Sequence, residues 1–90
     1  MIIEYTKTRE DAHSPQRANP SDAGLDVFYS TKEPDEIIAV HPNASALVPT
    51  GLRFGVPHGY MLEVKNRSSV AAKLNLVVGA CVIDSGYDGE

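Results

Sequence analysis

The chain has 90 residues and a single cysteine, Cys81, so it makes at most one small domain, over residues 1–90, that no internal disulfide stabilises. Its net charge of −4 at pH 7 disfavours broad nucleic-acid binding, which needs a basic face. The apolar runs fall far short of the ~18 residues of a membrane span, and the N-terminus lacks the features of a signal peptide. We therefore expect an intracellular, cytoplasmic protein that binds neither nucleic acid nor membrane.

Short apolar or alternating runs predict strands along the first half of the chain. Proline and glycine separate these runs, as turn residues separate the strands of an all-β domain. An acidic turn is expected over residues 33–36, where Pro34 lies. The expected strands cover residues 2–6, 25–29 and 37–40, and a kinked strand or strand pair covers residues 46–54 around Pro49 and Gly51.

The second half of the chain contains two more predicted strands and one short helix. Residues 60–65 alternate, so that every second side chain faces the same side. Residues 74–83 are apolar throughout, which predicts a strand buried on both faces, with Cys81 as a small buried apolar residue. Only residues 69–73 suggest a helix, about one turn long. Six or so short strands in total predict an all-β sandwich or barrel.

The first candidate stretch for a functional site is PSDAGLDVF, residues 20–28. Gly24 permits a tight turn or a close approach of the backbone to a ligand. Asp26 follows inside a predicted strand, where aspartate is disfavoured. The alternative interpretation is a plain turn whose aspartates hydrogen-bond the local backbone.

The second candidate stretch is NRSSVAAK, residues 66–73, in which an arginine and two serines precede a helical turn of small residues. Ser68 and Ser69 can cap the free N–H groups of that turn. The same N–H groups, the two hydroxyls and the Arg67 guanidinium also make a phosphate site. The alternative is a capped turn with a surface arginine.

The third candidate stretch is CVIDSGYDGE, residues 81–90. Asp84 directly follows two β-branched residues, so a strand delivers its carboxylate to a strand end, and the Ser-Gly pair after it is typical of a hairpin turn. A carboxylate on a rigid strand end can orient and deprotonate a water. Tyr87 places an aromatic ring three residues away, which can pack on a flat ligand or a sugar. The alternative is a hairpin whose aspartate bonds the turn backbone.

Taken in order, these stretches resemble the first three motifs of the trimeric dUTP pyrophosphatases (dUTPases). AGLD at residues 23–26 resembles the first motif, RSSVAAK at residues 67–73 the second, and VIDSGYDGE at residues 82–90 the third. Between the first two, VPTGLRFGVPHGYMLEV is similar to the family's strand–turn–strand run. Each motif alone is weak, but three in order are specific, and the resemblance covers essentially the whole chain from Pro20 onward.

The resemblance implies an all-β, jelly-roll-like barrel or sandwich, a homotrimer with shared active sites, and hydrolysis of dUTP to dUMP and pyrophosphate with Mg2+. It implies that Asp84 activates the water that attacks the α-phosphorus, and that Asp26 holds a water of the Mg2+ shell. Tyr87 is expected to pack against the deoxyribose and leave no room for a ribose 2′-hydroxyl. The other implied contacts are phosphate binding by Arg67, Ser68 and Ser69 from a neighbouring subunit, and nucleoside binding by Val82 and Ile83.

Four positions depart from the family pattern and leave the base contacts open. One is Asp88, which stands where arginine or another polar residue is common. Asn66 stands where the family often has proline or another small residue, and Cys81 where glycine is frequent. Val78 stands where some members carry a base-binding asparagine. The family also continues past Glu90 with more strands, a fourth motif and a glycine-rich arm, so the fold is expected to be incomplete here at its C-terminus.

Two alternatives remain. One is a relative of the dCTP deaminase type, which shares the fold and a similar arginine-serine-serine motif. Such relatives typically carry tryptophan after the hairpin turn, where this chain has Tyr87. The other is a non-catalytic member of the fold, either truncated or used as a binding module.

Overall fold

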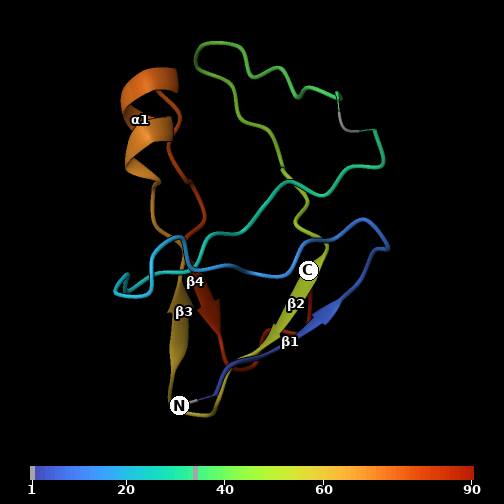
Figure 1. The fold of residues 1–90 in the computed structure, drawn as a ribbon, viewed down its shortest axis with the longest axis vertical. Helices are drawn as coiled ribbons and strands as arrows, with labels where there is room; N and C mark the ends of the chain where they lie inside the picture. The colour runs from blue at the N-terminus through green and yellow to red at the C-terminus, as the bar shows by residue number, and fades with distance from the viewer. Residues whose placement is uncertain (1, 34) are drawn as a thin grey trace. The chain divides into compact units, whose positions relative to one another are not determined.

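The computed structural model describes residues 2–33 and 35–90. Its regular elements follow the order β1 (Glu4–Lys7), β2 (Leu52–Gly55), β3 (Met61–Glu63), α1 (Ser68–Leu74) and β4 (Val82–Asp84) (Figure 1). β1 lies beside β2, and β3 beside β4, so the described strands form two 2-stranded sheets and no closed barrel. Within these ranges no helix has the length and apolar character that crossing a membrane requires.

The contacts along the chain divide it into two compact units. The first, called the hairpin unit, comprises residues 2–4 and Gly55–Gly89; the second, called the loop unit, comprises Tyr5–Phe54 together with Glu90. Each unit is described by itself. That residues 1–90 form one domain stays a prediction.

The hairpin unit is built on the antiparallel pair β3–β4. Its register opposes Met61 to Asp84, Leu62 to Ile83, and Glu63 to Val82. The half-buried Leu62 lies between two exposed neighbours, which confirms the alternation predicted for this run. The Val64 N–H donates to the Cys81 carbonyl at 2.7 Å, so the pairing continues one step beyond the strands, towards α1.

α1 confirms the short helix predicted after the arginine and covers 7 residues. It ends at Asn75, whose left-handed backbone (φ 53°, ψ 36°) turns the chain away from the helix axis. No side chain of the helix is buried. A helix this short is marginal in water, so its position depends on the chain that holds its two ends.

The apolar run over residues 74–83 is not the continuous buried strand that its composition predicts. Its first residue ends α1, and only Val82 and Ile83 join β4. Val77 is 76% exposed, and Cys81, expected to be buried, is exposed. An unbroken apolar run indicates burial but does not say what covers the run, and among the described residues of this one only Ile83 is as much as half-buried.

The loop unit is mostly irregular, and two of its predicted strands do not form. Residues 37–40 carry no strand, and in residues 25–29 only Asp26 pairs, in an isolated antiparallel bridge with Gln16. A strand needs a neighbour as well as a suitable sequence, and these runs have none among the described residues. The acidic turn is supported by a hydrogen bond from the Glu36 N–H to the Glu33 carbonyl at 2.9 Å, while Pro34 lies outside the described residues.

The core of the loop unit is small and centres on the start of β2. Leu52 is 2% exposed and Ala12 7%. Gly51, which directly precedes Leu52, has φ +69°, and a Cβ there would lie 2.7 Å from the Ala12 Cβ. Both its backbone and its surroundings therefore require glycine. Among the described residues of the hairpin unit, only Val56 is a buried apolar residue. This agrees with the marginal core expected for a chain of this length.

Candidate functional site

The end of β4 presents the candidate catalytic carboxylate. Asp84 is the last residue of the strand, and the chain turns immediately after it. The Tyr87 N–H donates to the Asp84 carbonyl at 3.1 Å, which closes the turn over the Ser-Gly pair. The turn predicted from the sequence is therefore present, and it holds the backbones of Asp84 and Tyr87 at its two ends. Both side chains are exposed, so both can reach a ligand.

The two residues before Asp84 form the strand that carries it. Ile83 is half-buried and Val82 is 52% exposed. Each is paired to β3 through the register of the hairpin. β4 thus gives Asp84 a fixed backbone and leaves Val82 available to contact a ligand.

Arg67, Ser68 and Ser69 lie together at the beginning of α1. Arg67 is the N-cap, with extended backbone (φ −77°, ψ 124°), and the two serines are the first residues of the helix. No side-chain hydrogen bond caps this end, so the expectation that a serine caps it is wrong. The reason is position: a side chain caps from the residue before the helix, and that residue is arginine.

Lys65 adds a second cationic side chain to this segment, but its charge is offset. Its ammonium lies 2.9 Å from a carboxylate oxygen of Glu63, and both groups are exposed. The hydrogen bond to Glu63, with the attraction between the two charges, raises the pKa of Lys65 above its ordinary value. Lys65 therefore stays charged but contributes little net charge beside Arg67.

The two halves of the expected site lie towards opposite ends of the β3–β4 pair. Asp84 is opposite Met61, at the end of the pair away from α1, and Val82 is opposite Glu63, at the end from which the chain leaves for α1. Figure 1 shows α1 beyond one end of this pair and the chain leaving the other end of β4. The chain from Met61 to Arg67 would span up to roughly 20 Å if it were fully extended. The hairpin thus separates the arginine–serine segment from the turn that follows Asp84.

Asp26 lies in the loop unit, apart in the chain from the other candidate residues. Its N–H donates to the Gln16 carbonyl at 2.7 Å and its carbonyl accepts the Gln16 N–H at 3.1 Å. The residue is half-buried. The bridge fixes the backbone of Asp26 even though the predicted strand around it does not form.

Metal binding by protein ligands alone finds no support in the described residues. Over 2–33 and 35–90, no three or more histidine, cysteine, aspartate or glutamate side chains gather as a group that could hold a metal ion. Mg2+ commonly keeps several waters and takes only one or two carboxylates, with substrate phosphates supplying other oxygens. That Asp26 acts through a water of the Mg2+ shell stays a prediction.

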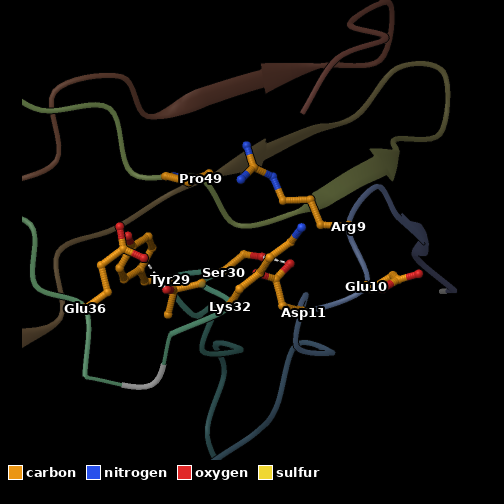
Figure 2. A pocket seen from close by; sticks show the side chains of 9 residues that line it. Arg9, Glu10, Asp11, Tyr29, Ser30, Lys32, Glu36 and Pro49 are labelled. Carbon is orange, nitrogen blue, oxygen red and sulfur yellow. Dashed lines mark hydrogen bonds between the residues drawn. The ribbon is translucent and has the colours of Figure 1, made fainter.

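A cavity of about 590 Å3 in the loop unit does not coincide with any expected site residue. Its walls carry charges of both signs: Arg9 and Lys32 are positive, and Asp11 and Glu36 are negative (Figure 2). The Ser30 hydroxyl donates to Asp11 Oδ1 at 3.0 Å, so two of its polar groups already satisfy each other. The cavity is separate from the chemistry that the three motifs predict.

Sequence reasoning missed one contact close to the candidate phosphate-binding residues. The Asn66 Oδ1 accepts the Val78 N–H at 2.8 Å. The partner is 12 positions away, and no local pattern connects an asparagine side chain to a distant backbone amide. The only hint was that both positions depart from the family pattern.

Comparison with known proteins decides the family. A family model described as dUTPase matches residues 10–90. The chain belongs to the dUTPase family. The match includes all three motifs recognised in the sequence, and it starts ahead of the first of them.

Individual dUTPases support the same assignment. Over 88 residues the chain is 34% identical to a deoxyuridine 5'-triphosphate nucleotidohydrolase of Chlamydia trachomatis serovar D, covering 96% of this chain and 59% of that protein. It is 40% identical over 78 residues to the protein of the same name from Gloeobacter violaceus, covering 84% of this chain and 51% of that protein. The chain therefore spans between half and two thirds of the length of these relatives.

A solved structure gives the same result for the fold. The dUTPase from phage phi11 of S. aureus superposes with a TM-score of 0.84 at 30% identity, covering 99% of this chain and 55% of that one. A D95N mutant of that phage enzyme matches equally well, and its structure is described as showing the coordination of a structural Mg(II) ion. The all-β dUTPase fold expected from the sequence is confirmed, and this chain carries part of it.

Proposed function

We propose that the protein to which this chain belongs hydrolyses dUTP to dUMP and pyrophosphate. The observation that carries the proposal is the carboxylate at the end of β4, held in a hydrogen-bonded turn with Tyr87, in a chain of the dUTPase family. Phosphoryl transfer depends on positioning and charge neutralisation more than on covalent chemistry. A strand end that fixes the backbone of an aspartate in one turn with a tyrosine suits that requirement.

Asp84 is the general base of the proposed reaction. Its carboxylate accepts a proton from a water as the water attacks the α-phosphorus, and the bond from that phosphorus to the bridging oxygen of the pyrophosphate breaks. Val82 and Ile83 contribute backbone groups and the wall of the hairpin to the nucleoside. Tyr87 packs on the deoxyribose, where its ring excludes a 2′-hydroxyl by steric contact.

The phosphates are bound by Arg67, Ser68 and Ser69 of a neighbouring subunit. The separation of these residues from Asp84 along the β3–β4 pair supports this arrangement, because one hairpin does not bring the two groups to the same point. A homotrimer in which each site combines two subunits satisfies both groups at once. It also adds buried surface to a chain whose own core is small.

Mg2+ neutralises charge on the triphosphate when it is bound. Asp26 is the residue of this chain that we assign to it, through a hydrogen bond to a water of the metal shell. The bridge to Gln16 fixes the backbone from which that side chain extends.

The decisive experiment replaces the proposed base in the full-length protein. Asp84→Asn keeps the size of the side chain but removes its basicity, so kcat for dUTP is expected to fall by about 100- to 10,000-fold. Release of dUMP from dUTP with Mg2+ present measures this.

Asp88→Asn is the matched control, because it makes the same change four residues later in the same segment. It is expected to retain turnover close to that of the unmodified protein. Absence of dUMP production by the unmodified protein, or ammonia release from dCTP in its place, would reject the proposed reaction. Equal turnover of the Asp84→Asn and unmodified proteins would reject the assignment of the base.

A further inference from the structure

The segment that carries Arg67, Ser68 and Ser69 connects β3 to β4. Two successive hydrogen bonds link the chain that leaves β3 to the chain that returns to β4. The first is the backbone hydrogen bond from the Val64 N–H to the Cys81 carbonyl at 2.7 Å. The second lies further from the strands, where the Asn66 Oδ1 accepts the Val78 N–H at 2.8 Å. The chain between these last two residues, 67–77, forms a loop closed at its base by a side chain.

The helix in this loop contributes little to holding the loop's shape. α1 has 7 residues, no side-chain cap at its start and no buried side chain. A helix of that length is not stable by itself, so its start is placed by whatever fixes the chain just before it. Asn66 is that residue, since it directly precedes Arg67.

The side chain of Asn66 supplies the acceptor that a paired strand would otherwise supply. Beyond Val64 and Cys81 the two chain segments no longer pair through backbone groups in the register of β3 and β4. An asparagine amide oxygen reaches across and takes the place of a backbone carbonyl. The Val78 N–H is satisfied in this way, and the two arms of the loop are tied together one residue before the arginine.

We propose that Asn66 is a positioning residue for triphosphate binding: by accepting the Val78 N–H, it closes the loop over residues 67–77 and fixes the direction in which Arg67 and the two serines are presented. This inference rests on the proposed function, since it assigns those three residues to the phosphates. Asn66 itself touches no substrate in this proposal. Its effect passes through the loop to the residues that bind the phosphates.

The test uses the full-length protein and interrupts the contact from each side in turn. Asn66→Ala removes the acceptor, and Val78→Pro removes the donor, because proline has no N–H. Val78→Ala is the matched control, since it shortens the same side chain and keeps the N–H. KM and kcat for dUTP are measured for these proteins and for the double variant Asn66→Ala/Val78→Pro.

Because the contact is a single exposed hydrogen bond, its removal is expected to have a moderate effect, and only on phosphate binding. KM for dUTP is expected to rise by about two- to tenfold in Asn66→Ala and in Val78→Pro, with kcat changed much less. KM for the double variant is expected to rise no further than KM for the more strongly affected single variant, because both substitutions remove the same contact. Inhibition by inorganic triphosphate should weaken in parallel, while inhibition by deoxyuridine, which has no phosphate, should not.

Amide hydrogen exchange gives a second readout that does not depend on activity. The Val78 amide is expected to exchange more slowly in the unmodified protein than in Asn66→Ala, while the Val64 amide keeps its protection in both. This measurement still tests the contact if Val78→Pro fails to fold.

Two results would overturn the inference while leaving the proposed function intact. One is a KM for dUTP in Asn66→Ala equal to that of the unmodified protein. The other is a double variant whose KM increase equals the product of the two single increases. Failure of the unmodified protein to hydrolyse dUTP is a different result, and it would reject the proposed function itself.

Discussion

The ring of Tyr87 lies against Gly89, two residues further along the chain. A Cβ added at Gly89 would lie 2.5 Å from the Tyr87 hydroxyl oxygen and 2.7 Å from Cζ. The clash is with the far end of a side chain, so the ring can move aside without unfolding the turn. We therefore expect Gly89→Ala to keep the fold and to displace the ring that is proposed to exclude the ribose 2′-hydroxyl.

The effect of Gly89→Ala should appear as lost sugar discrimination. The ratio of kcat/KM for dUTP to that for UTP is expected to fall by about tenfold, the scale of one small steric contact. Gly86→Ala is the matched control, because nothing lies within 4 Å of a Cβ at Gly86. An unchanged ratio in Gly89→Ala would show that the position of the Tyr87 ring does not set the preference.

What the sequence reveals about single residues depends on how far away their partners are. Asp84 and Tyr87 are bound into one turn that the sequence predicts, because the turn chemistry is local. Asn66 bonds an amide 12 positions away, and no local pattern marks that contact. The proposed roles of both groups in catalysis or binding stay predictions until tested.

At the scale of elements, Glu90 fastens the start of β2 to the chain that follows β1. Its carboxylate accepts a hydrogen bond from the Thr8 hydroxyl at 2.8 Å and from the Gly51 N–H at 3.1 Å. The Arg9 Nε lies 3.5 Å from the same carboxylate. These hydrogen bonds, with that from Thr8 the largest influence, hold the pKa of Glu90 below its ordinary value.

This lowered pKa predicts how stability responds to pH. The carboxylate stabilises the folded state fully above its ordinary pKa of 4.5, and that contribution is lost as pH falls through the lowered folded value. Glu90→Gln is therefore expected to lower the urea midpoint at pH 7 and to resemble the unmodified protein in strong acid. Glu10→Gln removes the same charge nearby as a control. A deficit in Glu90→Gln that is equal at pH 7 and in strong acid would contradict this role.

The elements that the sequence predicts correctly are those with short-range signals. The helix after Arg67 and the strand at residues 60–65 follow from local periodicity and are present as α1 and β3. The strands predicted at residues 25–29 and 37–40 do not form. Their sequences suit a strand, but a sequence carries no record of whether a neighbouring strand will be available.

At the scale of the whole molecule, exposed apolar side chains far outnumber buried ones among the described residues. Leu47 is 97% exposed and Ile37 87%, whereas among residues 2–33 and 35–90 only Ala12, Leu52 and Val56 are buried apolar residues. Exposed apolar surface of this extent is typical of a surface that packs against other protein. The fold family was predictable because three motifs identify it, but the ninety residues carry no pattern that identifies a partner for this surface.

Residues 1–90 expressed alone are therefore expected to bind a hydrophobic dye such as ANS and to lack a sharp thermal transition. A chain with the full length of the relatives is the control. It is expected to bind little dye and to scatter light with the mass of about three subunits, as the proposed trimer requires. A cooperative transition and weak dye binding by residues 1–90 alone would show that the described core is sufficient.

The pairing of β1 with β2 also affects how the protein is made. β1 lies at Glu4–Lys7 and its only partner strand among the described residues, β2, lies at Leu52–Gly55. At a synthesis rate of about 5–20 residues per second, β1 is made roughly 2–9 seconds before its partner. During that interval its backbone groups have no ladder to join, and water takes the place of the missing strand partner. β1 can therefore pair only after the chain has been made as far as β2, which is still before β3 and β4 are synthesised.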